Sequence, residues 1–151
     1  MDADRELAHL REGAAAEAPP GDLDELLVSC PEGAERVLAG VREVLEVVLA
    51  HQTGPWPSVD EWKQLLPEWF VSSCVDDRQV RDCVLDKWSL RAWTYWFQPD
   101  QRGWRWWDAR AEGDRLHVWL LVEERPYLRG ALEWLLQTAG AEEVADSPAR
   151  S

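Results

Sequence analysis

The sequence contains little of what marks a secreted or membrane protein. Its 151 residues include three cysteines, Cys30, Cys74 and Cys83, which are widely spaced and form no Cys-x-x-Cys pair. No apolar run reaches about 18 residues, and the acidic N-terminus lacks the apolar core of a secretory signal. These absences argue against a disulfide framework, a membrane-spanning helix and secretion. We therefore predict a cytoplasmic location and no membrane partner.

Isoleucine and asparagine are absent as well, and only two of the 16 basic residues are lysines. These three residue types have AT-rich codons, so the composition predicts a GC-rich, bacterial genome. Tryptophan is in excess, with 11 residues against two tyrosines and two phenylalanines. Part of the tryptophan and arginine content follows from the codon bias, and that part says nothing about function.

Motifs for catalysis and cofactor binding are also missing. There is no Gly-x-Ser-x-Gly turn to present a nucleophile, and the nine glycines are scattered instead of forming a phosphate-binding loop. Zinc sites need paired ligands at short spacing, whereas His9, His51 and His117 stand far apart. The sequence therefore predicts no metal and no cofactor, and it favours a non-catalytic protein.

The charge is strongly negative, at −13 overall. Such a chain repels nucleic acid and anionic membranes and favours a basic protein or a neutral ligand as its partner, although acidity can also serve solubility alone. The segment 102–107 interleaves arginine with tryptophan, as single-strand binders do. Because no basic stripe accompanies it, we predict no nucleic-acid partner.

Composition divides the chain into three parts. An alanine-rich stretch that ends in Pro19-Pro20-Gly21 separates the start of the chain from the rest. We predict a flexible N-terminal segment over residues 1–21 with a short helix near residues 5–11, a single domain over 22–145, and a frayed tail over 146–151.

Capping signals and apolar stripes predict helices across the first 88 residues. The expected helices follow Asp22, run from Ser29 to about His51, follow Ser58 as far as Pro67, and follow Asp76 or Asp77. The first three begin with Asp or Ser and have Glu three residues later, which is the capping-box pattern. The second carries valines at steps of three and four, which is typical of a buried helix face.

The hydrophobic period changes after residue 89. Residues 90–97, 104–111 and 115–122 alternate between large apolar and other side chains, and short polar loops separate them. This pattern predicts a three-stranded antiparallel meander. A last helix is expected from Pro126 to Gly140, which is placed as its C-terminal glycine. The predicted fold class is therefore α+β, with a helical N-terminal half, the meander and a C-terminal helix.

The strand alternation predicts two different sheet faces. One carries ordinary core residues, namely Leu116, Val118, Leu120, Trp107 and Ala109. The other carries the candidate binding residues Arg91, Trp93, Tyr95, Trp104, Trp106, Asp108, Arg110, His117 and Trp119. Aromatic rings mixed with charges suit a protein hot spot or ligand stacking. If the helices with Trp56, Trp62 and Trp69 cover this face, it is core instead.

Three functions are compatible with such a face. The one we favour is a protein-interaction module that could neutralise a basic partner. The second is a domain that binds a small molecule or sugar, which requires a concave site. The third is an enzyme that uses Asp108 and His117 as a pair, which requires the two side chains to converge. The exposed sheet edges also leave room for a homodimer.

Overall fold

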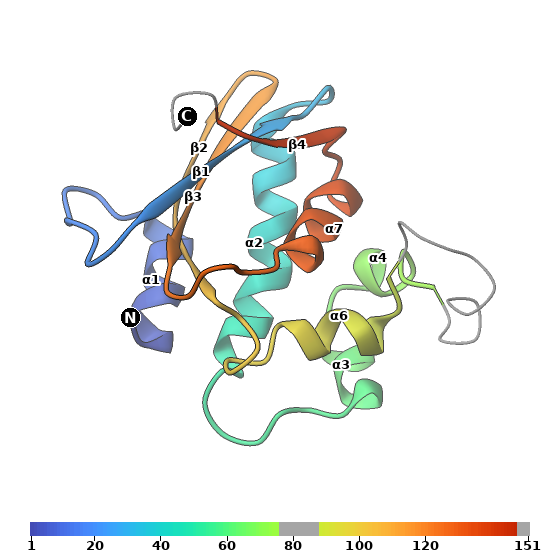
Figure 1. The fold of residues 1–151 in the computed structure, drawn as a ribbon. Helices are drawn as coiled ribbons and strands as arrows, with labels where there is room; N and C mark the ends of the chain where they lie inside the picture. Colours follow the sequence, from blue (N-terminus) through green and yellow to red (C-terminus); the bar gives the residue numbers. More distant parts are fainter. Residues whose placement is uncertain (76–87, 148–151) are drawn as a thin grey trace.

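A four-stranded antiparallel sheet in the order β2-β3-β1-β4 is the centre of the fold (Figure 1). This computed structural model describes residues 1–75 and 88–147. The strands are β1 (Leu23–Ser29), β2 (Trp104–Glu112), β3 (Arg115–Val122) and β4 (Glu143–Asp146). The helices are α1 (Ala3–Glu12), α2 (Ala34–Ala50), α3 (Val59–Leu65), α4 (Glu68–Val71), α6 (Leu90–Trp96) and α7 (Gly130–Thr138). The α+β class is confirmed, and the helix expected after Asp76 or Asp77 lies outside the described residues.

The helix predicted after Asp22 is wrong, because this segment is strand β1 in the middle of the sheet. It pairs with β3 on one side and with β4 on the other. Leu26 and Val28 are fully buried while the residues between and beside them are half-buried, which is the period of a strand. Pairing on both sides satisfies the backbone of β1, and this long-range gain outweighs the local capping pattern.

The strand predicted over residues 90–97 is also wrong, because these residues form helix α6. The Ser89 side chain caps it by accepting a hydrogen bond from the Ala92 amide at 3.1 Å. Its buried residues Leu90, Trp93, Thr94 and Phe97 follow the spacing of one helix face. The meander is therefore reduced to the β2–β3 hairpin, and β1 and β4 complete the sheet.

The remaining predicted elements are present, with shifted ends. Helix α2 begins at Ala34 and buries its valine and leucine stripe, and α3 begins with the predicted box between Ser58 and Glu61. Helix α7 begins four residues after Pro126, so Leu128 precedes the helix and is 69% exposed. Gly140 adopts a φ of 124° just after α7, a conformation that favours glycine.

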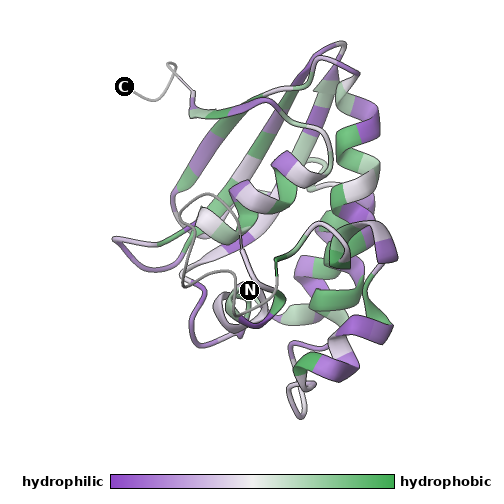
Figure 2. Ribbon diagram, turned by 90° about the vertical axis from the view of Figure 1, so that its right-hand side faces the viewer, coloured by the Kyte–Doolittle hydropathy of each residue, from purple (hydrophilic) through white to green (hydrophobic). Residues whose placement is uncertain are grey.

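The main core lies between one face of the sheet and helices α2 and α7 (Figure 1). Hydrophobic and hydrophilic residues alternate along the strands in Figure 2, as expected for a sheet with one face on the core. Helices α3, α4 and α6 extend this core at one end of α2, where Trp62, Phe70 and Trp93 are fully buried.

Helix α1 lies along β2, which is an edge strand of the sheet. The Glu6 carboxylate accepts a hydrogen bond from the Trp106 amide at 2.7 Å, and His9 Nδ1 lies 2.9 Å from the Trp107 carbonyl oxygen. These backbone groups have no partner strand on that side, so α1 closes an edge that would otherwise be open. The helix predicted near residues 5–11 is confirmed, whereas the domain boundaries at residues 21 and 145 stay predictions.

Candidate functional site

A bulge in β2 decides which tryptophans lie on which face of the sheet. Trp106 pairs with Leu120, but Asp108 pairs with Trp119, so Trp107 is an extra residue on β2. An extra residue shifts the alternation along the strand, so every side chain beyond it points to the opposite face of the sheet from the one that simple alternation predicts. Trp104 and Trp106 therefore join the core face, and Trp107 packs with Leu121 on the second face, the reverse of what alternation predicts.

Three of the candidate binding residues are core residues, Trp104 and Trp106 because of the bulge and Trp93 because it lies on the buried face of α6. Trp93, Trp104 and Trp106 are 0%, 3% and 1% exposed. The Trp93 indole donates a hydrogen bond to the Ala131 carbonyl oxygen at 2.8 Å, and the Arg102 guanidinium lies over the Trp104 ring. The prediction that these three rings share a sheet face with Trp119 is wrong.

Two further candidates, Arg91 and Tyr95, lie on α6 and away from the sheet. Both line a cleft between α6 and the segment that leads into α3. Tyr95 is 45% exposed, and its ring packs edge-on against Trp96. The structure therefore separates these residues from the sheet face to which the predicted strand assigned them.

Arg110, His117 and Trp119 come together on the second face of the sheet. His117 stacks on Trp119 with ring centroids 5.9 Å apart and planes inclined by 16°. The Arg110 guanidinium lies 5.7 Å from the centre of the Trp119 ring, within the range of a cation–π contact. Arg110 and His117 face each other across β2 and β3, so the hairpin itself positions both side chains around the ring.

Two glutamates hold His117 in this arrangement. His117 Nδ1 lies 2.9 Å from Glu25 Oε2, and Nε2 lies 3.7 Å from Glu112 Oε2. We call the five residues Glu25, Arg110, Glu112, His117 and Trp119 the Trp119 patch. Glu25 is not among the candidates predicted from the sequence, because the capping pattern after Asp22 favours a helix over its segment. The alternation of buried Leu26 and Val28 is the signal that could have placed it on a strand.

Residues from the N-terminal segment cover only part of this second face. Ala14, Trp107 and Leu121 form a small separate core there, against which Met1, Leu23 and Trp119 pack. The alternative, in which Trp56, Trp62 and Trp69 cover this face, is not what the structure shows: Trp62 packs against His51 and Trp56, and Trp69 lies against Gly40 of α2. Within the patch Arg110 and Glu112 are more than half exposed, and Trp119 is half-buried.

Asp108 and His117 do not converge. Asp108 is opposite Trp119 in the sheet, whereas His117 is opposite Arg110 and binds Glu25. One Asp108 oxygen accepts a hydrogen bond from the Ala109 amide at 2.8 Å. The pair that an Asp–His enzyme site requires is therefore not formed by these two residues.

Within residues 1–75 and 88–147, no group of three or more His, Cys, Asp or Glu side chains is arranged to hold a metal ion. No helix in these ranges combines the length and the apolar composition needed to cross a bilayer. Compared with known proteins, the chain matches no family model, and no curated protein or solved structure is significantly similar to it.

Proposed function

We propose that this chain is a non-catalytic protein-interaction module and that the Trp119 patch is its binding surface. One observation carries the proposal: a tryptophan ring is fixed by His117 and Arg110 on a sheet face that the N-terminal segment covers only in part. Trp and Arg are the residues that most often dominate the energy of protein interfaces. We also propose a cytoplasmic location, on the basis of the cysteine content.

The geometry of the patch favours a protein over a small ligand. It is formed by neighbouring residues of three adjacent strands, β1, β2 and β3. A sheet face of this kind offers a broad contact area, whereas small molecules need a concave site that buries most of their surface. Contacts with His117 and Arg110 fix the Trp119 ring before a partner arrives, which lowers the entropy lost on binding.

The charge favours a basic partner. The chain has a net charge of −13, and the patch contributes Glu25 and Glu112 beside Arg110 and His117. A net negative potential accelerates the encounter with a positively charged protein, and the effect weakens as salt rises. Binding should therefore depend on the ring for affinity and on the overall charge for the rate of association.

The test is affinity capture from the source cell with the wild-type chain and two variants. Trp119→Ala should weaken binding of the captured protein about 30-fold, the loss expected for a hot-spot residue of about 2 kcal/mol. Leu128→Ala removes a side chain that is more exposed and lies away from the patch, and it should bind like wild type. Thermal melts check that all three chains fold.

Two outcomes would contradict the proposal. One is that Trp119→Ala and Leu128→Ala bind the captured protein equally well while both stay folded. The other is that no stoichiometric partner is recovered at either low or moderate salt.

A further inference from the structure

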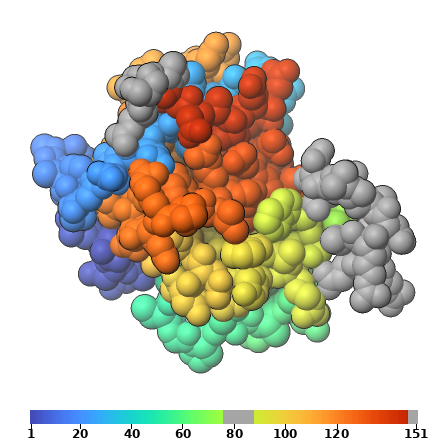
Figure 3. All heavy atoms as spheres, viewed as in Figure 1, coloured from blue at the N-terminus to red at the C-terminus, as the bar shows by residue number. Residues whose placement is uncertain are grey.

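A cleft of about 480 Å³ opens between α6 and the residues that lead into and begin α3. These two segments lie against each other at one end of the molecule, below the sheet in Figure 1 and on the surface seen in Figure 3. The residues that matter for recognition are Trp56, Asp60, Lys63, Arg91, Tyr95 and Gln98. The volume falls in the range of small-molecule sites, roughly 300–1,000 Å³.

Basic side chains outnumber acidic ones among the residues that line this cleft. Lys63 and Arg91 line it together with a single carboxylate, Asp60, whereas the chain as a whole has a net charge of −13. Lys63 is one of only two lysines in the sequence. Among the residues that the structure describes, no carboxylate forms an ion pair with its ammonium group within 4.0 Å. A small anion would give Lys63 a partner.

Aromatic rings form the other walls of the cleft, and their neighbours fix both of them. Trp56 packs edge-on against the fully buried Trp62, with ring centroids 5.0 Å apart. Tyr95 packs edge-on against Trp96 at 5.1 Å and is itself 45% exposed. Two fixed rings that face a cleft can contact a planar group of a ligand at little cost in side-chain entropy.

The backbone around the cleft is held in place by local hydrogen bonds. The Ser58 hydroxyl accepts from the Glu61 amide at 3.2 Å, and Glu61 Oε1 accepts from the Ser58 amide at 3.1 Å. On the opposite wall the Thr94 hydroxyl donates to the Leu90 carbonyl oxygen at 2.9 Å. Each wall therefore has its backbone anchored by hydrogen bonds within the chain, which lowers the entropy lost when a ligand binds.

We propose that this cleft binds a small organic anion with a planar ring. Lys63 binds the anionic group, the rings of Trp56 and Tyr95 contact the planar part, and the Gln98 amide supplies a further hydrogen bond. The anionic group can be a carboxylate or a phosphate, because an ammonium group recognises either. This site is separate from the Trp119 patch and does not depend on the function proposed for it.

Calorimetric titration of the full chain tests the proposal with four probes. Indole-3-acetate is a carboxylate with a planar ring, and adenosine 5′-monophosphate is a phosphate with a planar ring. We call these two probes the ringed anions, and indole-3-acetamide and adenosine are their neutral counterparts. At least one ringed anion should bind with a Kd below about 1 mM, and its neutral counterpart should bind at least about tenfold more weakly. Inorganic phosphate alone should bind more weakly than adenosine 5′-monophosphate, because it lacks the ring.

Two charge variants locate the site. Lys63→Gln should weaken binding of the ringed anion about tenfold, because it removes a cation that touches the ligand. Arg36→Gln makes the same change in net charge on α2, where the Arg36 side chain is 73% exposed, and should leave binding unchanged. In NMR spectra the indole N–H signal of Trp56 should move on titration, while that of Trp119 stays in place.

The proposal is overturned if neither ringed anion binds with a Kd below about 1 mM. It is also overturned if Lys63→Gln and Arg36→Gln weaken binding equally, because the effect is then one of general charge. Movement of the Trp119 signal without movement of the Trp56 signal would assign the ligand to the other surface.

Discussion

At the scale of single residues, one inserted residue decides the environment of several tryptophans. Alternation predicts Trp107 in the core and Trp106 on the second face, and the bulge at Trp107 exchanges the two. Large rings on both sides of the bulge leave no sign of it in the sequence. The position of the bulge follows from the pairing of β2 with β3. Leu120 pairs with Trp106 and the next residue, Trp119, pairs with Asp108, which leaves Trp107 without a partner on β3. The grouping of Arg110, His117 and Trp119 was predictable because all three lie on one side of the bulge.

A half-buried tyrosine should make stability sensitive to alkaline pH. Tyr127 donates a hydrogen bond to Asp24 Oδ2 at 2.6 Å. Burial, and then this bond to Asp24, raise the pKa of Tyr127 to about 12. The unfolded chain releases the phenol proton near pH 10, about the ordinary value, and the folded chain releases it only near pH 12. The contribution of Tyr127 to stability is therefore complete below pH 10 and is lost as the pH rises toward 12.

Tyr127→Phe should accordingly lower the free energy of unfolding at pH 8 by about 1 kcal/mol, the net value of one hydrogen bond. At pH 11 the difference between wild type and variant should be smaller, because only wild type loses stability by ionising this group. Urea unfolding at both pH values measures the two differences. Tyr95→Phe, at an exposed tyrosine, is the matched control. A difference that is the same at pH 8 and pH 11 would contradict the assignment.

At the scale of elements, the helices and strands that are predicted correctly are those in which the local sequence pattern and the contacts with distant parts of the chain favour the same structure. Helix α2 has a continuous apolar stripe over 17 residues, and the β2–β3 hairpin has alternation on both sides of Gly113. The two wrong elements, β1 and α6, have only seven residues each. In segments this short the apolar residues fit both the helical and the strand repeat, and contacts with distant parts of the chain decide which structure forms.

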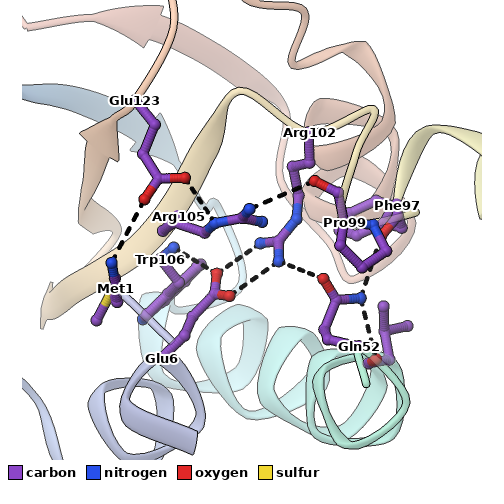
Figure 4. Close-up of polar contacts among 10 residues, drawn as sticks. Met1, Glu6, Gln52, Phe97, Pro99, Arg102, Arg105, Trp106 and Glu123 are labelled. Carbon is purple, nitrogen blue, oxygen red and sulfur yellow. Dashed lines mark hydrogen bonds and ion pairs between the residues drawn. The ribbon is translucent and has the colours of Figure 1, made fainter. Parts of the chain in front are cut away.

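A buried ion pair joins α1 to the beginning of β2. Arg102 Nη2 donates to Glu6 Oε1 at 2.8 Å and to Gln52 Oε1 at 2.7 Å, and both charged side chains are 1% exposed (Figure 4). Glu6 also accepts a hydrogen bond from the backbone amide of Trp106, which points away from β3. Removal of one charge would leave the other buried without compensation, which costs far more than the pair contributes when it is intact.

Glu6→Met should therefore lower the free energy of unfolding by about 3–5 kcal/mol, whereas the double variant Glu6→Met, Arg102→Met should recover part of that loss. Glu32→Gln, which breaks the exposed pair with Arg36, should cost less than about 0.5 kcal/mol. Urea denaturation compares the four chains. If Glu6→Met unfolds within about 1 kcal/mol of wild type, α1 does not hold the edge of β2 as the contacts indicate.

At the scale of the whole molecule, the two faces of the sheet are covered to different extents. Helices α2 and α7 cover the core face, where Leu116, Val118 and Leu120 are fully buried, and residues near the N-terminus shield only part of the other face. The acidic charge of the chain and the exposed part of that second face together favour an interaction role. Trp107 is covered by part of residues 1–21, the segment that the composition predicts to be flexible. Whether this segment stays packed on the sheet therefore determines how much of the second face, next to the Trp119 patch, is exposed.

Oxidative footprinting of the tryptophans in the folded, full-length chain distinguishes a packed N-terminal segment from a flexible one. Trp106 and Trp107 are neighbours in sequence and are 1% and 4% exposed, but Trp106 is buried in the main core and Trp107 packs with Ala14 and Leu121. We expect slow oxidation of both and faster oxidation of the half-buried Trp119, measured residue by residue by mass spectrometry. Rapid oxidation of Trp107 with continued protection of Trp106 would mean that the segment leaves the sheet in solution. The binding surface would then extend from Trp119 across Trp107 and Leu121, because the same segment that covers these residues would have exposed them.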